Sequence, residues 1–180
     1  YNDIKFSLEE QNEILEAILS NERPIVLNDV SFEFLKSNER YIRFSLQHSS
    51  PENLENIIDN IEIDDLPLSL QQAIYEQYIS KKDKLQSTSL EEKMKDNMYY
   101  MQDYLMENID RIDEIDMTGR YLPVKFKESL GRELLNRGYE ITDRTPRYLM
   151  QTREFVAEYV LRNPESIDTI GRRKIISLIT

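Results

Sequence analysis

The sequence predicts an all-α fold, either an irregular, solenoid-like α-helical repeat or a multi-helix bundle of about 8–10 helices. Apolar residues recur at helical spacing, and capping residues bound the periodic segments. The single short β-branched run, "RPIVLNDV", has no alternating partner segment. The 180 residues are 39% hydrophobic and 32% charged, which excludes a disordered chain.

The predicted helices follow from local signals, taken in chain order. The first, residues 7–20, opens with Ser7 and Glu10 spaced as a capping box, and one apolar stripe follows. The second lies in "PLSLQQAIYEQYIS" and the third in "TSLEEKMKDNMYYMQDYLMENI", where Thr88 or Ser89 is the expected N-cap. The stripes of these three are, in turn, Leu8, Ile14, Leu15, Ile18 and Leu19; Leu70, Ile74, Tyr78 and Ile79; and Leu90, Met94, Met98, Met101, Leu105 and Ile109.

Two further helices are predicted in the second half of the chain. "KFKESLGRELLNRG" ends at Gly138, which suits a left-handed C-cap. "TREFVAEYVLRN" begins after an N-cap at Thr152 and stops before Pro164.

A short phrase occurs three times, as "SPENLENI", "NIDRIDEI" and "NPESIDTI". We interpret residues 1–180 as a single α-helical domain of degenerate units, each about 22–28 residues long, after the N-terminal helix. A unit this short cannot cover its own apolar face, so neighbouring units must stack. The rival interpretation is chance recurrence of Ile, Asn and Asp within an ordinary bundle. The predicted units are residues 30–57, 66–86, 90–115, 122–141 and 145–170.

One stretch, "GYEITDRTPRYLMQTREFVAEYVLRNPESI", resembles a short bacterial α-helical tandem repeat of unknown function. The resemblance implies a helical fold and occurrence in tandem within larger multidomain proteins, and it implies no activity. It covers residues 138–167. The residues that carry it are Gly138, Thr145, Pro146, Leu149, Glu154, Phe155 and Val156.

The net charge of −11 is unevenly spread. Residues 1–118 hold 11 basic and 26 acidic residues, a net −15, whereas residues 119–180 hold 12 basic and 8 acidic residues, a net +4. The basic residues of the second part are mostly Arg, whose guanidinium suits two-point contact with a carboxylate or phosphate. The alternative is that these charges only solvate helix surfaces. The residues predicted to contact a partner are Arg144, Arg147, Arg153, Arg172, Arg173 and Tyr99.

Signatures of chemistry are missing from the sequence. There is no Cys, His48 is the one histidine, and four scattered glycines cannot form a phosphate-binding loop. Asp110, Asp113 and Asp116 recur every third residue and could nominally hold Mg²⁺, but they interleave with apolar residues, which favours a solvent face. We therefore predict no catalytic, metal-binding or cofactor-binding residue, and for His48 a helix-capping role.

These features together favour a non-catalytic helical module for protein–protein interaction or scaffolding within a larger bacterial protein. The partner would be a protein or another domain of the same parent. The alternatives are an accessory domain that positions a catalytic domain of an enzyme or toxin, and nucleic-acid binding through the Arg-rich part, which the acidic net charge opposes.

Length and hydropathy set the remaining expectations. A start at Tyr1 and an end within "KIISLIT" indicate a fragment of a longer protein. No apolar run approaches the roughly 18 residues that a membrane span needs, and a cytoplasmic location is expected.

Overall fold

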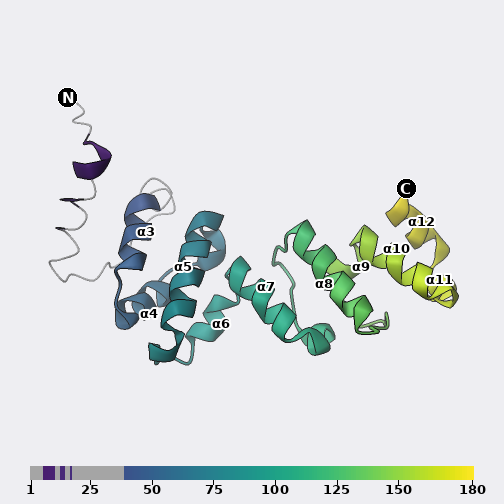
Figure 1. The fold of residues 1–180 in the computed structure, drawn as a ribbon. Coiled ribbons are helices and arrows are strands. Elements are labelled where there is room, and N and C mark those ends of the chain that lie inside the picture. Colours follow the sequence, from purple (N-terminus) through teal and green to yellow (C-terminus); the bar gives the residue numbers. More distant parts are fainter. Residues whose placement is uncertain (1–5, 11–12, 15–16, 18–38) are drawn as a thin grey trace. The chain divides into compact units, whose positions relative to one another are not determined.

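The computed structural model describes residues 6–10, 13, 14, 17 and 39–180 (Figure 1). Residues 39–180 form ten α-helices, α3 to α12, and four 3₁₀-helices, and this range contains no strand. The all-α prediction is therefore confirmed for the described part of the chain. The run "RPIVLNDV", half of the predicted helix 7–20 and the start of the predicted unit 30–57 lie outside the described residues.

The capping box at the N-terminal helix is confirmed. The Ser7 amide donates to Glu10 Oε2 at 2.7 Å, and the Glu10 amide donates to Ser7 Oγ at 3.2 Å. The hydrogen bond from the Ser7 backbone lowers the pKa of Glu10. Of the predicted apolar stripe, Leu8 and Ile14 are both exposed, and the other three members lie outside the described residues.

The chain divides into two compact units, residues 1–101 and 102–180, with the boundary inside α7. In the first unit, α5 packs against α3 and α4, and α4 also packs against α6. Its elements are α3 (Glu39–Gln47), α4 (Pro51–Asp59), η1 (Ile63–Asp65), α5 (Leu68–Lys81), η2 (Lys82–Lys84), α6 (Leu90–Met94) and the start of α7 (Met98–Glu107). Its most deeply buried apolar residues are Leu46, Leu54, Ile58, Leu70, Ile74, Leu90 and Met94.

In the second unit, α10 packs against α8, α9 and α12. The elements after α7 are η3 (Ile109–Glu114), α8 (Val124–Asn136), α9 (Arg147–Met150), α10 (Arg153–Arg162), η4 (Pro164–Ser166), α11 (Ile167–Ile170) and α12 (Arg172–Ile179). The buried residues of this unit include Leu105, Ile112, Leu130, Leu134, Leu149, Phe155 and Val156.

Three helices begin directly after a proline. Pro67, Pro123 and Pro146 occupy the N-cap positions of α5, α8 and α9 with φ of −53°, −59° and −54°. The pyrrolidine ring sets this φ, so the chain enters each helix from an extended conformation. The residue before each proline is buried and anchors the entry point; these residues are Leu66, Leu122 and Thr145.

The prediction of one continuous helix over residues 90–109 is wrong, because this segment forms two helices, α6 and α7. The helix is interrupted between Met94 and Met98, and the buried side chain of Asn97 caps the N-terminus of α7. Its Oδ1 accepts hydrogen bonds from the amides of Tyr99 and Tyr100 at 3.0 and 3.2 Å.

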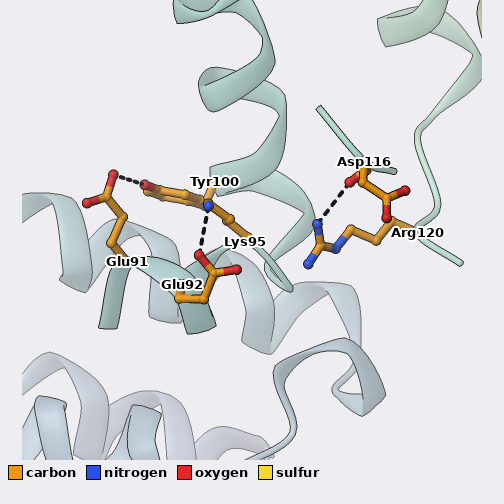
Figure 2. Close-up of polar contacts among 6 residues, drawn as sticks. All are labelled: Glu91, Glu92, Lys95, Tyr100, Asp116 and Arg120. Atoms are coloured by element: carbon orange, nitrogen blue, oxygen red, sulfur yellow. Dashed lines mark hydrogen bonds and ion pairs between the residues drawn. The ribbon is translucent and has the colours of Figure 1, made fainter. Parts of the chain in front are cut away.

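The N-cap asparagine is also tied to α5. Asn97 Nδ2 donates to the Gln71 carbonyl at 2.7 Å, and the Met98 amide donates to Gln71 Oε1 at 3.0 Å. Nearby, Tyr100 Oη donates to Glu91 Oε1 at 3.2 Å, as Figure 2 shows. These polar contacts fix the start of α7 in the first unit.

Between residues 70 and 109 the predicted buried positions are confirmed, with two corrections. Ile79 is 47% exposed because it follows Tyr78, which takes the buried position at the end of α5. Met98 is only half-buried because it stands at the first position of α7, directly after the break. Its amide donates to Gln71 of α5.

The predicted C-cap at Gly138 is confirmed. Its φ is +76°, a conformation that costs glycine little. The Tyr139 amide donates to the Leu134 carbonyl at 3.0 Å, and the Gly138 amide donates to the Leu135 carbonyl at 3.1 Å. This paired pattern is the Schellman arrangement.

Two segments share one backbone hydrogen-bond pattern. Four backbone hydrogen bonds between Met94 and Arg111 recur at positions 55 residues later in the chain. The pairs of amide-to-carbonyl bonds are Asn97–Met94 and Thr152–Leu149 (both 2.9 Å), Met101–Asn97 and Val156–Thr152 (2.9 and 3.2 Å), Asn108–Tyr104 and Asn163–Tyr159 (3.0 and 2.8 Å), and Arg111–Asn108 and Ser166–Asn163 (both 2.9 Å).

The asparagine that ends each of these helices repeats a side-chain bond as well. Asn108 Nδ2 donates to the Tyr104 carbonyl at 2.8 Å, and Asn163 Nδ2 donates to the Tyr159 carbonyl at 3.0 Å. The apolar residue that closes the recurring phrase is less regular, since Ile57 is buried whereas Ile115 and Ile170 are half-buried.

Candidate functional site

A groove of about 670 Å³ lies within the second unit. One wall is the end of η3 and the turn that follows it, and the other is the segment that leads into α9 together with α9 itself. The groove is lined by residues 113–120 and 144–148 and by Gln151.

The first wall is held in shape by a local turn. The Asp116 carboxylate accepts a hydrogen bond from the Thr118 amide at 2.8 Å, and this bond lowers the pKa of Asp116. Gly119 has a φ of +75°, and the Arg120 guanidinium donates to the Asp116 carbonyl at 3.3 Å (Figure 2). Met117 is buried beneath this turn, so the wall has an apolar anchor.

The second wall depends on Thr145 and Pro146. The buried Thr145 Oγ1 accepts a hydrogen bond from the Thr142 amide at 2.9 Å, which closes the turn before the proline. Pro146 then starts α9, and Leu149, fully buried, anchors that short helix. The side chains of Arg147 and Tyr148 consequently stand at the groove.

Tyr139 joins the two walls. Its hydroxyl donates to Asp113 Oδ1 at 2.5 Å and lies 2.8 Å from Thr145 Oγ1. Because the single phenolic proton goes to Asp113, the Thr145 hydroxyl must be the donor to Tyr139. Burial, together with the hydrogen bond to Asp113, raises the pKa of Tyr139, so it remains a donor across the physiological pH range.

The three carboxylates of the groove all have partners within the fold. Asp113 accepts from Tyr139, and Asp116 accepts from the Thr118 amide. Glu114 Oε2 accepts from Arg111 Nε at 2.9 Å and Nη2 at 2.8 Å. Of the three aspartates predicted to form a solvent face, Asp110 and Asp116 are exposed and Asp113 is half-buried. Asp110 lies outside the groove lining, and its Oδ1 is 3.3 Å from Arg137 Nη1.

Two arginines at the groove differ from these acids. Arg144 and Arg147 are exposed, and among the described residues no hydrogen bond or ion pair involves either guanidinium. Tyr148 lies beside Arg147, and its hydroxyl is shielded from solvent without a hydrogen-bond partner in the described part of the chain. Burial, followed by the charge of Asp113, raises the pKa of Tyr148. The groove thus presents positive charge, and beside it lies a shielded hydroxyl donor without a partner among the described residues.

The structure brings together two of the six residues predicted to contact a partner, Arg144 and Arg147. Arg153 Nε instead donates to the Leu178 carbonyl at 2.6 Å and so fastens α12. Arg172, at the start of α12, pairs with Asp168 of α11 at 3.3 Å, and Arg173 is exposed on α12. Tyr99 belongs to the first unit.

Tyr99 is stacked on another aromatic ring rather than standing alone. Its ring centroid lies 6.3 Å from that of Tyr75, and the two planes are inclined by 29°. The ring is half-buried, so only part of it can contact a partner.

Sequence reasoning missed Tyr148 and the Tyr139–Asp113 link. The available signal was the Thr-Pro pair at residues 145–146, which predicts a turn that projects the following side chains. Nothing in the sequence pairs Tyr139 with Asp113, because they are 26 residues apart and follow different helices.

Other kinds of site have little support among the described residues. No group of three or more His, Asp or Glu side chains there could hold a metal ion, and no helix there is long and apolar enough to cross a membrane. His48 follows α3 and packs its ring against Phe44, with centroids 4.4 Å apart. Comparison with protein-family models, with curated proteins and with solved structures gives no significant match.

Proposed function

We propose that this chain is a non-catalytic α-helical repeat module that binds a protein partner, either a separate protein or another domain of the same parent. The observation that carries the proposal is the groove at α9, where Arg144 and Arg147 have no partner among the described residues while every carboxylate has one. Exposed arginines that stabilise nothing in the fold are available for contact, and Arg is enriched among residues that dominate interfaces.

The repeat part of the proposal is supported by the hydrogen-bond pattern shared by residues 94–111 and 149–166. Each segment runs from the end of a short helix through a buried polar N-cap and a longer helix to an asparagine that starts a 3₁₀ turn. A stacked arrangement of such units, solenoid-like and of the kind that the resemblance over residues 138–167 implies, would leave grooves between successive segments as contact surfaces.

Site-specific photo-crosslinking in the native host tests the proposal. A benzoylphenylalanine introduced at Gln151, which is exposed and lines the groove, is expected to capture a discrete protein. The same probe at Glu165, exposed on η4 and away from the groove lining, is the control. The adduct should disappear in an R144E/R147E background.

Identical adducts at both positions, or no adduct at Gln151, would count against a protein-binding role. An adduct to nucleic acid rather than protein at Gln151 would support the alternative class.

A further inference from the structure

The charged side chains of the groove fall into two groups that the fold treats differently. Asp113, Glu114 and Asp116 are each engaged by a donor of the same unit, and Arg120, the third arginine of the lining, donates to the Asp116 carbonyl. Arg144 and Arg147 are engaged by no group among the described residues. The unused binding capacity of the groove is therefore cationic, although acids and arginines both line it.

We propose that the groove binds an acidic segment of a protein, with Arg144 and Arg147 each pairing with a carboxylate of that segment. This inference rests on the proposed function and specifies the chemistry of its partner. The planar guanidinium presents a fork of N–H donors that matches the two oxygens of a carboxylate.

Size and shape favour a segment over a folded surface. A volume of about 670 Å³ falls in the range of sites that enclose a small molecule or a few side chains. A peptide can place several side chains in such a space, whereas a globular partner could insert only one protruding loop.

The groove's own acids disfavour a ligand that concentrates negative charge on one group. A phosphate monoester carries up to two charges on one group, whereas a carboxylate carries one. Asp113, Glu114 and Asp116 line one wall, so each added negative charge is repelled at close range. Singly charged carboxylates that reach the opposite wall, where the arginines stand, avoid most of this repulsion.

Tyr148 adds a second indication of a ligand. A hydroxyl that is shielded from water without a partner is unfavourable in the folded state. Tyr148 lines the groove, and an acceptor atom of a bound segment that reaches this hydroxyl would satisfy it. The tyrosine is therefore expected to contribute to binding and to contribute nothing to stability through its oxygen.

In the binding test, an acetylated tetraglutamate peptide or its tetraglutamine counterpart is added to the whole chain. Binding is monitored through the arginine Nε–H signals in NMR spectra. The Glu peptide is expected to shift the signals of Arg144 and Arg147 and to bind at least about tenfold more tightly than the Gln peptide. Its affinity should fall as the salt concentration rises. R144Q/R147Q should reduce its affinity at least about tenfold, whereas R172Q/R173Q, with the same loss of charge on α12, should retain it.

Equal binding of the two peptides, or equal loss in both double variants, would overturn the inference. Tighter binding of inorganic phosphate or of an oligothymidine than of the Glu peptide would overturn it as well. These results are separable from the proposed function, because a partner captured at Gln151 whose contact region lacks acidic residues would sustain protein binding and refute the acidic segment.

Discussion

At Gly131, helix propensity and packing oppose each other. Glycine inside a helix is unfavourable by about 1 kcal/mol relative to alanine, so propensity alone favours a substitution in α8. A Cβ at this position would lie 2.9 Å from Cδ2 and 3.1 Å from Cβ of Phe155. Phe155 is almost fully buried in α10 and cannot yield, so the missing side chain is what allows the two helices to approach.

We therefore predict that G131A destabilises the chain by about 1–3 kcal/mol in spite of its better helix propensity. Thermal or urea unfolding followed by circular dichroism measures the change. G131A/F155L, which removes the obstructing ring, should recover part of the loss relative to F155L alone. A G131A variant more stable than the parent chain would show that α8 and α10 do not meet at this glycine.

Tyr148 gives a second prediction at the residue scale. Because its hydroxyl makes no hydrogen bond among the described residues, Y148F should leave the free energy of unfolding unchanged or raise it by up to about 1 kcal/mol. Y139F is the matched comparison, since it removes the bonds to Asp113 and Thr145 and should cost about 1–2 kcal/mol. Equal losses in the two variants, measured by urea unfolding, would contradict this contrast.

At the scale of helices, prolines and polar caps set the boundaries. Pro67, Pro123 and Pro146 begin three helices, each after a buried residue. Asn97 interrupts the helix within a long apolar stripe, because its side-chain oxygen accepts hydrogen bonds from the first amides of α7. Helix boundaries here follow from these single residues rather than from the apolar periodicity.

The cap at Asn97 leads to a prediction for α7. N97A removes the acceptor for the Tyr99 and Tyr100 amides and the donor to the Gln71 carbonyl, all in a buried site, and should cost about 2–3 kcal/mol. N60A is the control. Asn60 bonds to Asn56 on the surface after α4, so its loss should be below about 1 kcal/mol. Chemical denaturation that ranks N60A as the more harmful change would refute the role of the cap.

At the scale of the whole molecule, tyrosines link stability to alkaline pH. Burial raises the pKa of Tyr78, Tyr139 and Tyr148 above the ordinary value of 10.0. The unfolded chain ionises these groups near pH 10, whereas the folded chain retains the protons. Their contribution to stability is therefore complete below pH 10 and is lost as the pH rises beyond it.

The expected outcome is a melting temperature that is flat from about pH 8 to 9.5 and falls steeply above pH 10. Y139F/Y148F should show a shallower fall, because phenylalanine does not titrate in either state. The absorbance of tyrosinate near 295 nm, recorded in the same titration, should rise together with unfolding. A slope unchanged in the double variant would assign the alkaline loss to other groups.

The sequence by itself determined the all-α class, the capping box at Ser7 and the C-cap at Gly138, because each depends on residues within one or two helical turns. It also indicated the arginines of residues 144–147 as candidates for contact, through their residue type alone. Tertiary structure decided the rest. Only the fold pairs Tyr139 with Asp113, engages the groove's acids, uses Arg153 to fasten α12 and leaves Arg144 and Arg147 without a partner among the described residues. The Tyr139–Asp113 bond and the bond from Arg153 to the Leu178 carbonyl join residues 26 and 25 positions apart, and sequence periodicity carries no information about such distances.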